Sequence, residues 1–129
     1  MIFVDANYFL RFLDDSSEHH ETAKELFLEA AQGKKSCITS TVVLFEVYWV
    51  LKSFYGLGRT ELATKMESLL KMEFIGLPDR HIAQRAVRRF STGTLALEDC
   101  FHLENANELG CSEIATFDKK LAKAFTQKH

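Results

Sequence analysis

The stretch "IFVDANYFLRFL", residues 2–13, joins a short apolar run to a helix-like pattern through one carboxylate. The run at residues 2–4 is apolar at every position, which is typical of a strand in a parallel sheet covered on both faces. Residues 6–13 favour a short helix, and Asp5 stands where the N-cap of that helix would be. Because aspartate is rarely buried without a partner, Asp5 either caps this helix or belongs to a functional site.

Short strand-like segments continue to alternate with helix-like segments along the chain. Strands are expected at residues 2–5, 36–40, 73–77 and 112–118, and helices at residues 6–13, 19–33, 41–56, 59–72, 79–90, 97–110 and 119–125. This alternation predicts an α/β fold with a parallel sheet and right-handed crossovers. The segment 41–56 is apolar almost all round, so we expect a buried helix there.

The composition predicts one globular domain spanning residues 1–129. Hydrophobic residues make up 47% of the chain, which excludes a disordered protein. There is one proline and no long linker. No apolar run approaches the roughly 20 residues that cross a bilayer, and no secretory signal is recognisable. The odd number of cysteines argues against a disulfide framework, so we expect a cytoplasmic protein in which Cys37, Cys100 and Cys111 are small buried residues.

Two carboxylates stand where predicted strands end. Asp5 follows "IFV", and Asp118 follows "IATF". In open α/β sheets, functional sites form outside the carboxyl ends of the strands. Both side chains are therefore candidates for a site, with a plain helix N-cap as the alternative for each.

Two further acids occupy unusual helical positions. Glu46 lies inside "VVLFEVYWV", where the residues one turn away on either side are apolar. Desolvation of a lone carboxylate costs several kcal/mol, so Glu46 needs a cation, a proton or an exit to solvent. Asp99 falls in the first turn of the helix expected at 97–110, where it is either a partner of the helix dipole or a ligand.

A cluster of four acids at one end of the sheet would require a hard cation or shared protons, because four anions repel one another. A site built from carboxylates selects Mg²⁺ or Mn²⁺ over Zn²⁺, which prefers His and Cys ligands. The segment "HHETAK" (residues 19–24) lacks the second histidine of a zinc-protease motif. Divalent metals held by acids chiefly serve phosphate chemistry, so the four acids favour that class of reaction.

The net charge of −2 is unpromising for a nucleic-acid partner at first sight. Without the four candidate acids, however, the rest of the chain carries a net charge of +2. The basic residues either form solvated faces or hold a phosphodiester backbone, and the candidates are Arg80, Arg85, Arg88 and Arg89 on one predicted helix and Lys119, Lys120 and Lys123 after Asp118.

The arrangement resembles the PIN domain family, in particular the toxin ribonucleases of VapC type. The resemblance covers nearly the whole chain and rests on "FVDANYFLRFL", "TSTVVLFEVYWVL" and "LEDCFHLENANELGCSEIATFDKKL". It implies a single-domain, three-layer α/β/α fold with a central, mostly parallel sheet of four or five strands.

The resemblance also implies site residues, carried over by motif. They are Asp5, Glu46 and Asp99 as the three central acids, Asp118 in "ATFD" as the fourth, and Asn7 and Thr116 as supporting residues. Glu98 directly precedes Asp99, and adjacent residues on a helix point about 100° apart. Only one of the two is therefore expected to face the site, and the spacing to "ATFD" favours Asp99.

The resemblance implies a metal-dependent endoribonuclease that cuts RNA with Mg²⁺ or Mn²⁺ and leaves a 5′-phosphate and a 3′-hydroxyl. It further implies a protein antitoxin as partner and a homodimer. No membrane association is expected, because no apolar run is long enough to cross a bilayer. The alternative is a catalytically silent PIN-like domain that binds RNA or protein. A receiver domain of a signalling system is a rival of another class, but it would need paired acids after the first strand, where Asp5 stands alone.

Overall fold

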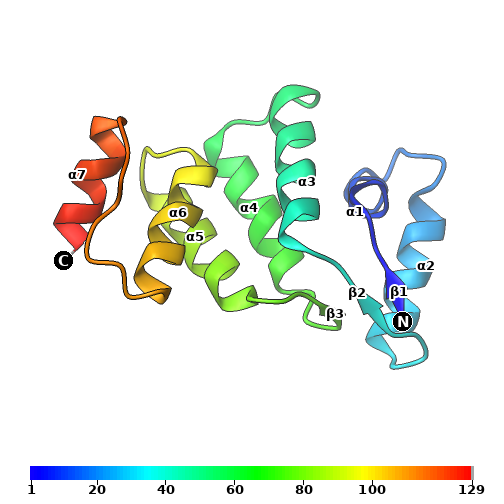
Figure 1. Cartoon of the computed structure of the whole chain (residues 1–129). Coiled ribbons are helices and arrows are strands. Elements are labelled where there is room, and N and C mark those ends of the chain that lie inside the picture. Colours follow the sequence, from blue (N-terminus) through cyan, green and yellow to red (C-terminus); the bar gives the residue numbers. More distant parts are fainter. Residues whose placement is uncertain (129) are drawn as a thin grey trace. The chain divides into compact units, whose positions relative to one another are not determined.

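The structure is a computed structural model that describes residues 1–128, with side chains through residue 126. It divides into two compact units, which meet in sequence at Pro78 and Asp79. The first unit contains β1 (Ile2–Phe3), α1 (Ala6–Leu13), α2 (His20–Ala31), β2 (Cys37–Ile38), α3 (Thr41–Ser53), α4 (Arg59–Leu70) and β3 (Ile75–Gly76) (Figure 1). The second unit contains α5 (Arg80–Thr92), α6 (Leu97–Glu108) and α7 (Lys119–Lys128).

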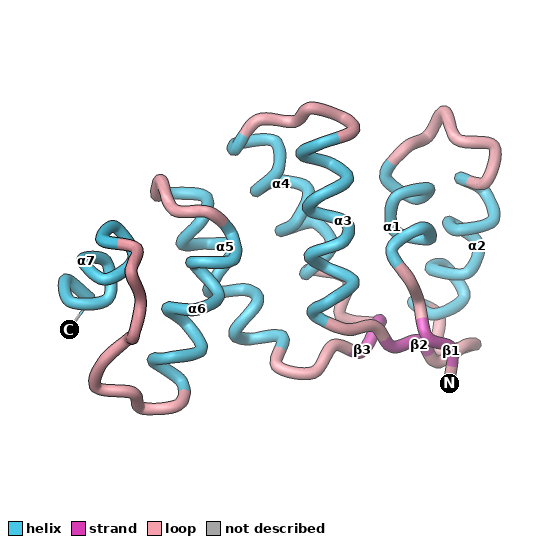
Figure 2. The backbone as a smooth tube through the Cα atoms, turned by 45° about the horizontal axis from the view of Figure 1, so that its top comes forward, coloured by secondary structure: helices cyan, strands magenta, loops and turns pink. Residues whose placement is uncertain are grey.

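The three strands of the first unit form one parallel sheet in the order β1-β2-β3 (Figure 2). Ile2 pairs with Cys37, and Cys37 in turn pairs with Ile75. Cys37 and Ile75 are buried, as expected for strands covered by helices. The expectation of a first strand covered on both faces is wrong, because β1 lies at an edge of the sheet and Ile2 and Phe3 are 37% and 59% exposed. Since β1 leads into α1 and β2 leads into α3, the parallel sheet aligns the starts of these two helices at one edge.

Aromatic side chains join α1 to α2 in the core of the first unit. The ring centroids of Phe9 and Phe27 are 5.4 Å apart, and those of Phe12 and Phe27 are 5.0 Å apart in an edge-on arrangement. Tilted and edge-on arrangements of this kind are the favourable ones for aromatic pairs. Helix α1 also contacts α3, and α3 contacts α4. The two helices that carry Asp5 and Glu46 therefore belong to one packed body.

In the second unit α5 and α6 lie side by side, and α7 packs against α6 (Figure 1). The α6–α7 contact is built on Leu103, Leu121 and Phe125, all at most 5% exposed. The segment between the two helices adds Ile114 to this cluster. Helices α6 and α7 both begin at the end of the unit where α5 finishes (Figures 1 and 2).

The predicted α/β class with a parallel sheet is confirmed. Each of the seven expected helices is present, with ends within three residues of the predicted ones, and three of the four expected strands form. The single domain predicted from the composition stays a prediction.

The expectation of a fourth strand at residues 112–118 is wrong, because this segment is not a strand. The expectation of four or five strands is wrong too, since the sheet in the described residues has three. A strand needs a neighbour with which to exchange backbone hydrogen bonds, and this segment has none in the sheet. Its apolar residue Ile114 packs against the α6–α7 cluster instead. Phe117 is fully exposed, at 106%.

The expectation that α3 is a buried helix is also wrong. Val42 and Trp49 of α3 are 69% and 43% exposed. Among the cysteines, Cys37 and Cys100 are buried as expected, but Cys111 is exposed, and none of the three forms a disulfide bond within the described residues. Within the described residues, no helix combines the length and apolar character needed to cross a membrane.

Candidate active site

Asp5 is the N-cap of α1, directly after β1. Its backbone is extended, and its Oδ1 atom accepts hydrogen bonds from the N–H groups of Asn7 at 3.0 Å and Tyr8 at 3.4 Å. These bonds satisfy two of the donors that the start of a helix leaves free. Asp5 is exposed, and within the described residues its Oδ2 atom accepts no hydrogen bond. Cap and ligand are therefore compatible roles, because one oxygen caps the helix while the other is available.

Thr39 ties the end of β1 to the end of β2. Its Oγ1 atom donates a 2.8 Å hydrogen bond to the carbonyl oxygen of Val4, and the Val4 N–H donates to the carbonyl of Ile38, also at 2.8 Å. Thr39 is buried, at 4% exposure, so this bond is shielded from water. It holds the backbone in place immediately before Asp5. Sequence reasoning missed Thr39, although its alternation with the buried Cys37 would have predicted an inward side chain.

Glu46 lies on an exposed face of α3. Val42 and Trp49, one turn before and after it, are exposed, and so is Glu46 itself. The opposite face of the helix buries Val47 and Tyr48. Of the three explanations for this acid, the exit to solvent is the one that the structure shows. The carboxylate stands between two exposed apolar side chains and is accessible to a ligand.

Asn7 follows Asp5 in the first turn of α1. Its backbone N–H is used by the Asp5 cap, and its side-chain amide makes no hydrogen bond within the described residues. Together with Tyr8, Arg11 and His19 it lines a cavity of about 230 Å³ at the α1–α2 junction. The side-chain amide of Asn7 is therefore available beside the Asp5 cap, which fits the predicted supporting role of Asn7.

Glu98 and Asp99 both stand in the first turn of α6, which has no side-chain N-cap bond because Ala96 occupies the cap position. Acidic side chains are favoured there by the free N–H groups and the helix dipole. Both residues are half-buried. The Oε1 atom of Glu98 is buried and has no hydrogen-bond partner among the described residues. That Asp99, and not Glu98, faces the site stays a prediction.

Asp118 caps α7 in the same way that Asp5 caps α1. Its Oδ1 atom accepts hydrogen bonds from the N–H groups of Lys120 at 2.9 Å and Leu121 at 3.1 Å. The Asp118 N–H in turn donates to Oγ1 of Thr116 at 3.0 Å. Thr116 therefore supports Asp118 by shaping the turn before α7.

The loop before α6 is joined to the first turn of α7. The Lys120 ammonium, two residues after Asp118, donates a 3.1 Å hydrogen bond to the carbonyl oxygen of Thr94, five residues before Asp99. Leu103 and Leu121, one turn further along their helices, share one apolar cluster. Because α6 and α7 begin at the same end of the unit (Figure 1), these contacts place the two acids at that end.

The chemistry of the donors fits a hard divalent cation. The candidates are carboxylates, joined by the amide of Asn7 and the hydroxyl of Thr116, and these oxygen ligands suit Mg²⁺ and Mn²⁺. In the first unit, Asp5 lies at the start of α1 and Glu46 on the exposed face of α3. In the second unit, Asp99 and Asp118 lie at the starts of α6 and α7. Among the described residues, no three His, Cys, Asp or Glu side chains form a group able to hold a metal ion, so the convergence of all four acids stays a prediction.

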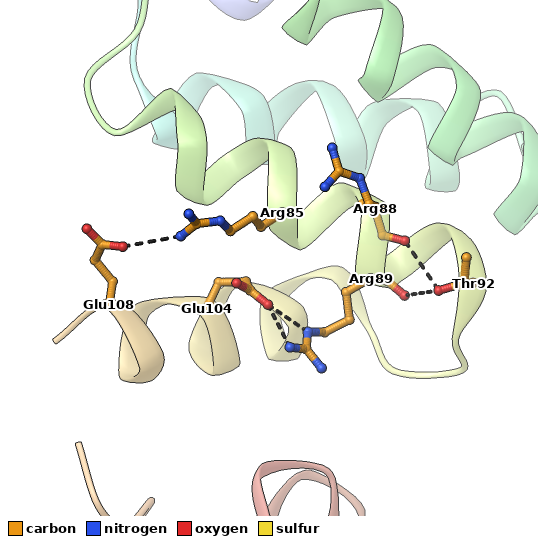
Figure 3. Close-up of polar contacts among 6 residues, drawn as sticks. All are labelled: Arg85, Arg88, Arg89, Thr92, Glu104 and Glu108. Carbon is orange, nitrogen blue, oxygen red and sulfur yellow. Dashed lines mark hydrogen bonds and ion pairs between the residues drawn. The ribbon is translucent and has the colours of Figure 1, made fainter. Parts of the chain in front are cut away.

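The predicted basic helix is partly neutralised. Arg89 donates from Nε at 2.9 Å and Nη2 at 2.6 Å to one carboxylate oxygen of Glu104, which is 7% exposed (Figure 3). Arg85 pairs with Glu108 at 3.3 Å. The hydrogen bond from His81, helped by its charge and by Arg85, holds the pKa of Glu108 below its usual value. Two of the arginines therefore fasten α5 to α6, which the spacing on one helix did not reveal.

Comparison with known proteins identifies one family. The PIN domain pattern matches residues 2–125, nearly the whole chain. PIN domains are generally metal-dependent nucleases, which agrees with the oxygen donors described above. No curated protein and no solved structure matches the chain. Since the match extends over far more than half of the sequence, the chain belongs to the PIN domain family.

Proposed function

We propose that this PIN domain is an Mg²⁺- or Mn²⁺-dependent endoribonuclease and the toxin of a toxin–antitoxin pair, acting in the cytoplasm. The observation that supports this most is the family match over residues 2–125, in a chain that keeps all four candidate acids. Asp5 and Asp118 each use only one carboxylate oxygen for a cap. Both therefore retain an oxygen for a metal ion.

Asp5, Asp99 and Asp118 would hold the metal, and Glu46 would bind it or orient the attacking water. When bound, a divalent cation lowers the pKa of water and neutralises charge on the phosphate. Asn7 would support the first of these acids through its free amide, and Thr116 supports Asp118 through the turn at the start of α7. Single-stranded or looped RNA is the expected substrate, because its phosphates are accessible to a small site.

A protein antitoxin and a homodimer belong to the same proposal. An arginine of the antitoxin would pair with the candidate carboxylates and compete with metal, since an arginine and a carboxylate form strong paired hydrogen bonds. Exposed apolar side chains on α3, Val42 and Trp49, are available for protein contacts. Size-exclusion chromatography with light scattering tests the dimer, and a purely monomeric protein would contradict it.

The test of the activity is RNA cleavage with Mn²⁺ by the wild type and by Asp5→Asn. Asparagine caps helices as well as aspartate does, so this variant keeps the fold and removes the charge. We expect cleavage to fall at least about a hundredfold, since loss of a metal ligand removes most of the metal's contribution. Equal activity in both proteins, or cleavage that persists in EDTA, would contradict the metal-acid site. No cleavage by the wild type would favour the catalytically silent alternative.

A further inference from the structure

A basic groove of about 480 Å³ lies on the second unit, where α5 ends and α7 passes. It is lined by Arg89 of α5, by residues 92–95 of the following loop, and by Lys120 and Lys123 of α7, with Ala124. No acidic residue of the described chain lines it. We call this feature the α5–α7 groove.

The positive charges of the α5–α7 groove are only partly compensated. Arg89 is neutralised by Glu104 (Figure 3). Lys120 donates to the neutral carbonyl oxygen of Thr94, so its charge is retained. Lys123 is exposed and forms no hydrogen bond or ion pair within the described residues. The groove therefore presents two uncompensated ammonium groups, which favours an anionic ligand.

Backbone donors in the loop add to these charges. Gly93 leaves α5 in an extended conformation, and a Cβ atom there would come within 3.1 Å of the Arg89 carbonyl oxygen. The N–H groups of Gly93 and Thr94 donate to no acceptor among the described residues. Free backbone N–H groups beside lysine ammonium groups are the donors that bind phosphate oxygens in proteins.

Residues that line the groove lie close in sequence to both acids of the second unit. Its loop runs directly into α6, where Asp99 lies in the first turn, and Lys120 follows Asp118 by two residues. A nucleic-acid strand with a phosphate near these acids would reach the groove with its neighbouring phosphates. The chain thus combines anion donors and candidate metal ligands at one end of one packed unit.

We propose that the α5–α7 groove binds the phosphate backbone of single-stranded RNA beside the scissile bond, with Lys120 and Lys123 as positioning residues. The inference rests on the proposed ribonuclease function and adds where the substrate strand lies. Contacts of this kind carry affinity and orientation without reading sequence. They also make binding weaken with salt, at a slope of about 0.7 per phosphate contact on single strands.

The experiment measures binding separately from cleavage. A fluorescein-labelled single-stranded RNA of about twelve nucleotides, long enough for a typical single-strand site, is titrated in EDTA with the wild type, Lys123→Gln and the double variant Lys120→Gln/Lys123→Gln. Lys71→Gln, an exposed lysine of the first unit outside the groove, is the matched control. Lys123→Arg keeps the charge and is expected to bind as the wild type does.

We expect about a fivefold loss of affinity for Lys123→Gln and a larger loss for the double variant, with the salt slope lower by about 0.7 in the single variant and about 1.4 in the double variant. Wild-type affinity and slope in both groove variants, or an equal loss in Lys71→Gln, would overturn the proposal. The same proteins are then assayed for cleavage with Mn²⁺. If the lysine variants weaken RNA binding but the wild type cleaves no RNA, only the proposed nuclease function is contradicted. If the wild type cleaves RNA but the lysine variants bind it normally, only the proposed role of the α5–α7 groove is contradicted.

Discussion

The sharpest prediction concerns Asp118, for which the structure shows a helix cap and we propose a role as metal ligand. Alanine at this position removes the acceptor of two hydrogen bonds, from Lys120 N–H at 2.9 Å and Leu121 N–H at 3.1 Å. Loss of an N-cap of this kind costs about 1 kcal/mol, within a range of 0.5–2, or roughly 3–5 °C in melting temperature for a chain of this size. Asparagine keeps the acceptor, so Asp118→Asn should lose only about a few tenths of a kcal/mol from the helix dipole.

The two variants therefore separate stability from activity. We expect Asp118→Asn to melt close to the wild type and Asp118→Ala to melt lower, while both lose metal-dependent RNA cleavage. Thermal melting by circular dichroism and a cleavage assay with Mn²⁺ give the two readouts. Asp15→Ala is the control, since Asp15 is exposed and makes no hydrogen bond within the described residues. Full cleavage by Asp118→Asn would refute the ligand role, and unchanged melting of Asp118→Ala would refute the cap.

Three further predictions test the supporting structure. Glu104→Gln leaves the half-buried Arg89 without its charge partner and should cost about 2–3 kcal/mol in urea unfolding; no loss would contradict the pair. Thr39→Val removes a buried hydrogen bond without changing side-chain size and should cost about 1–2 kcal/mol in the same assay, where a neutral result would contradict it. The lowered pKa of Glu108 stabilises the folded state above its unfolded pKa and ceases to do so as pH falls through the folded pKa. His81→Ala should raise the pKa of Glu108 in an NMR titration, and an unchanged pKa would exclude His81 as its main cause.

Local patterns made most of the fold predictable. The signals for helices depend on only a few neighbouring residues: the periodicity, the position of Asp5 before α1 and the glycines after helices. Each expected helix is present. The end of a strand and the start of a helix are local signals too, so the caps at Asp5 and Asp118 could be anticipated. That each cap uses only one carboxylate oxygen could not be anticipated, because this depends on the backbone geometry of the turn.

Features that depend on distant partners could not be predicted. Residues 112–118 have the composition of a strand, but a strand also needs a neighbouring edge, and Ile114 packs on helices instead. The pairing of Arg89 with Glu104 requires the register between α5 and α6, which no single segment reveals. The sequence left three explanations open for Glu46, because its neighbours on α3 are apolar, and it could not show that two of them, Val42 and Trp49, are themselves exposed.

The most direct test of the central claim, that acids of both units hold one metal, is Mn²⁺ binding by isothermal titration calorimetry. The proteins are the wild type, Asp5→Asn from the first unit, Asp99→Asn from the second, and Asp15→Asn as a control. The claim predicts that either ligand variant weakens Mn²⁺ binding at least about tenfold, while the control binds as the wild type does. Wild-type affinity in Asp5→Asn or in Asp99→Asn would contradict a shared four-acid site.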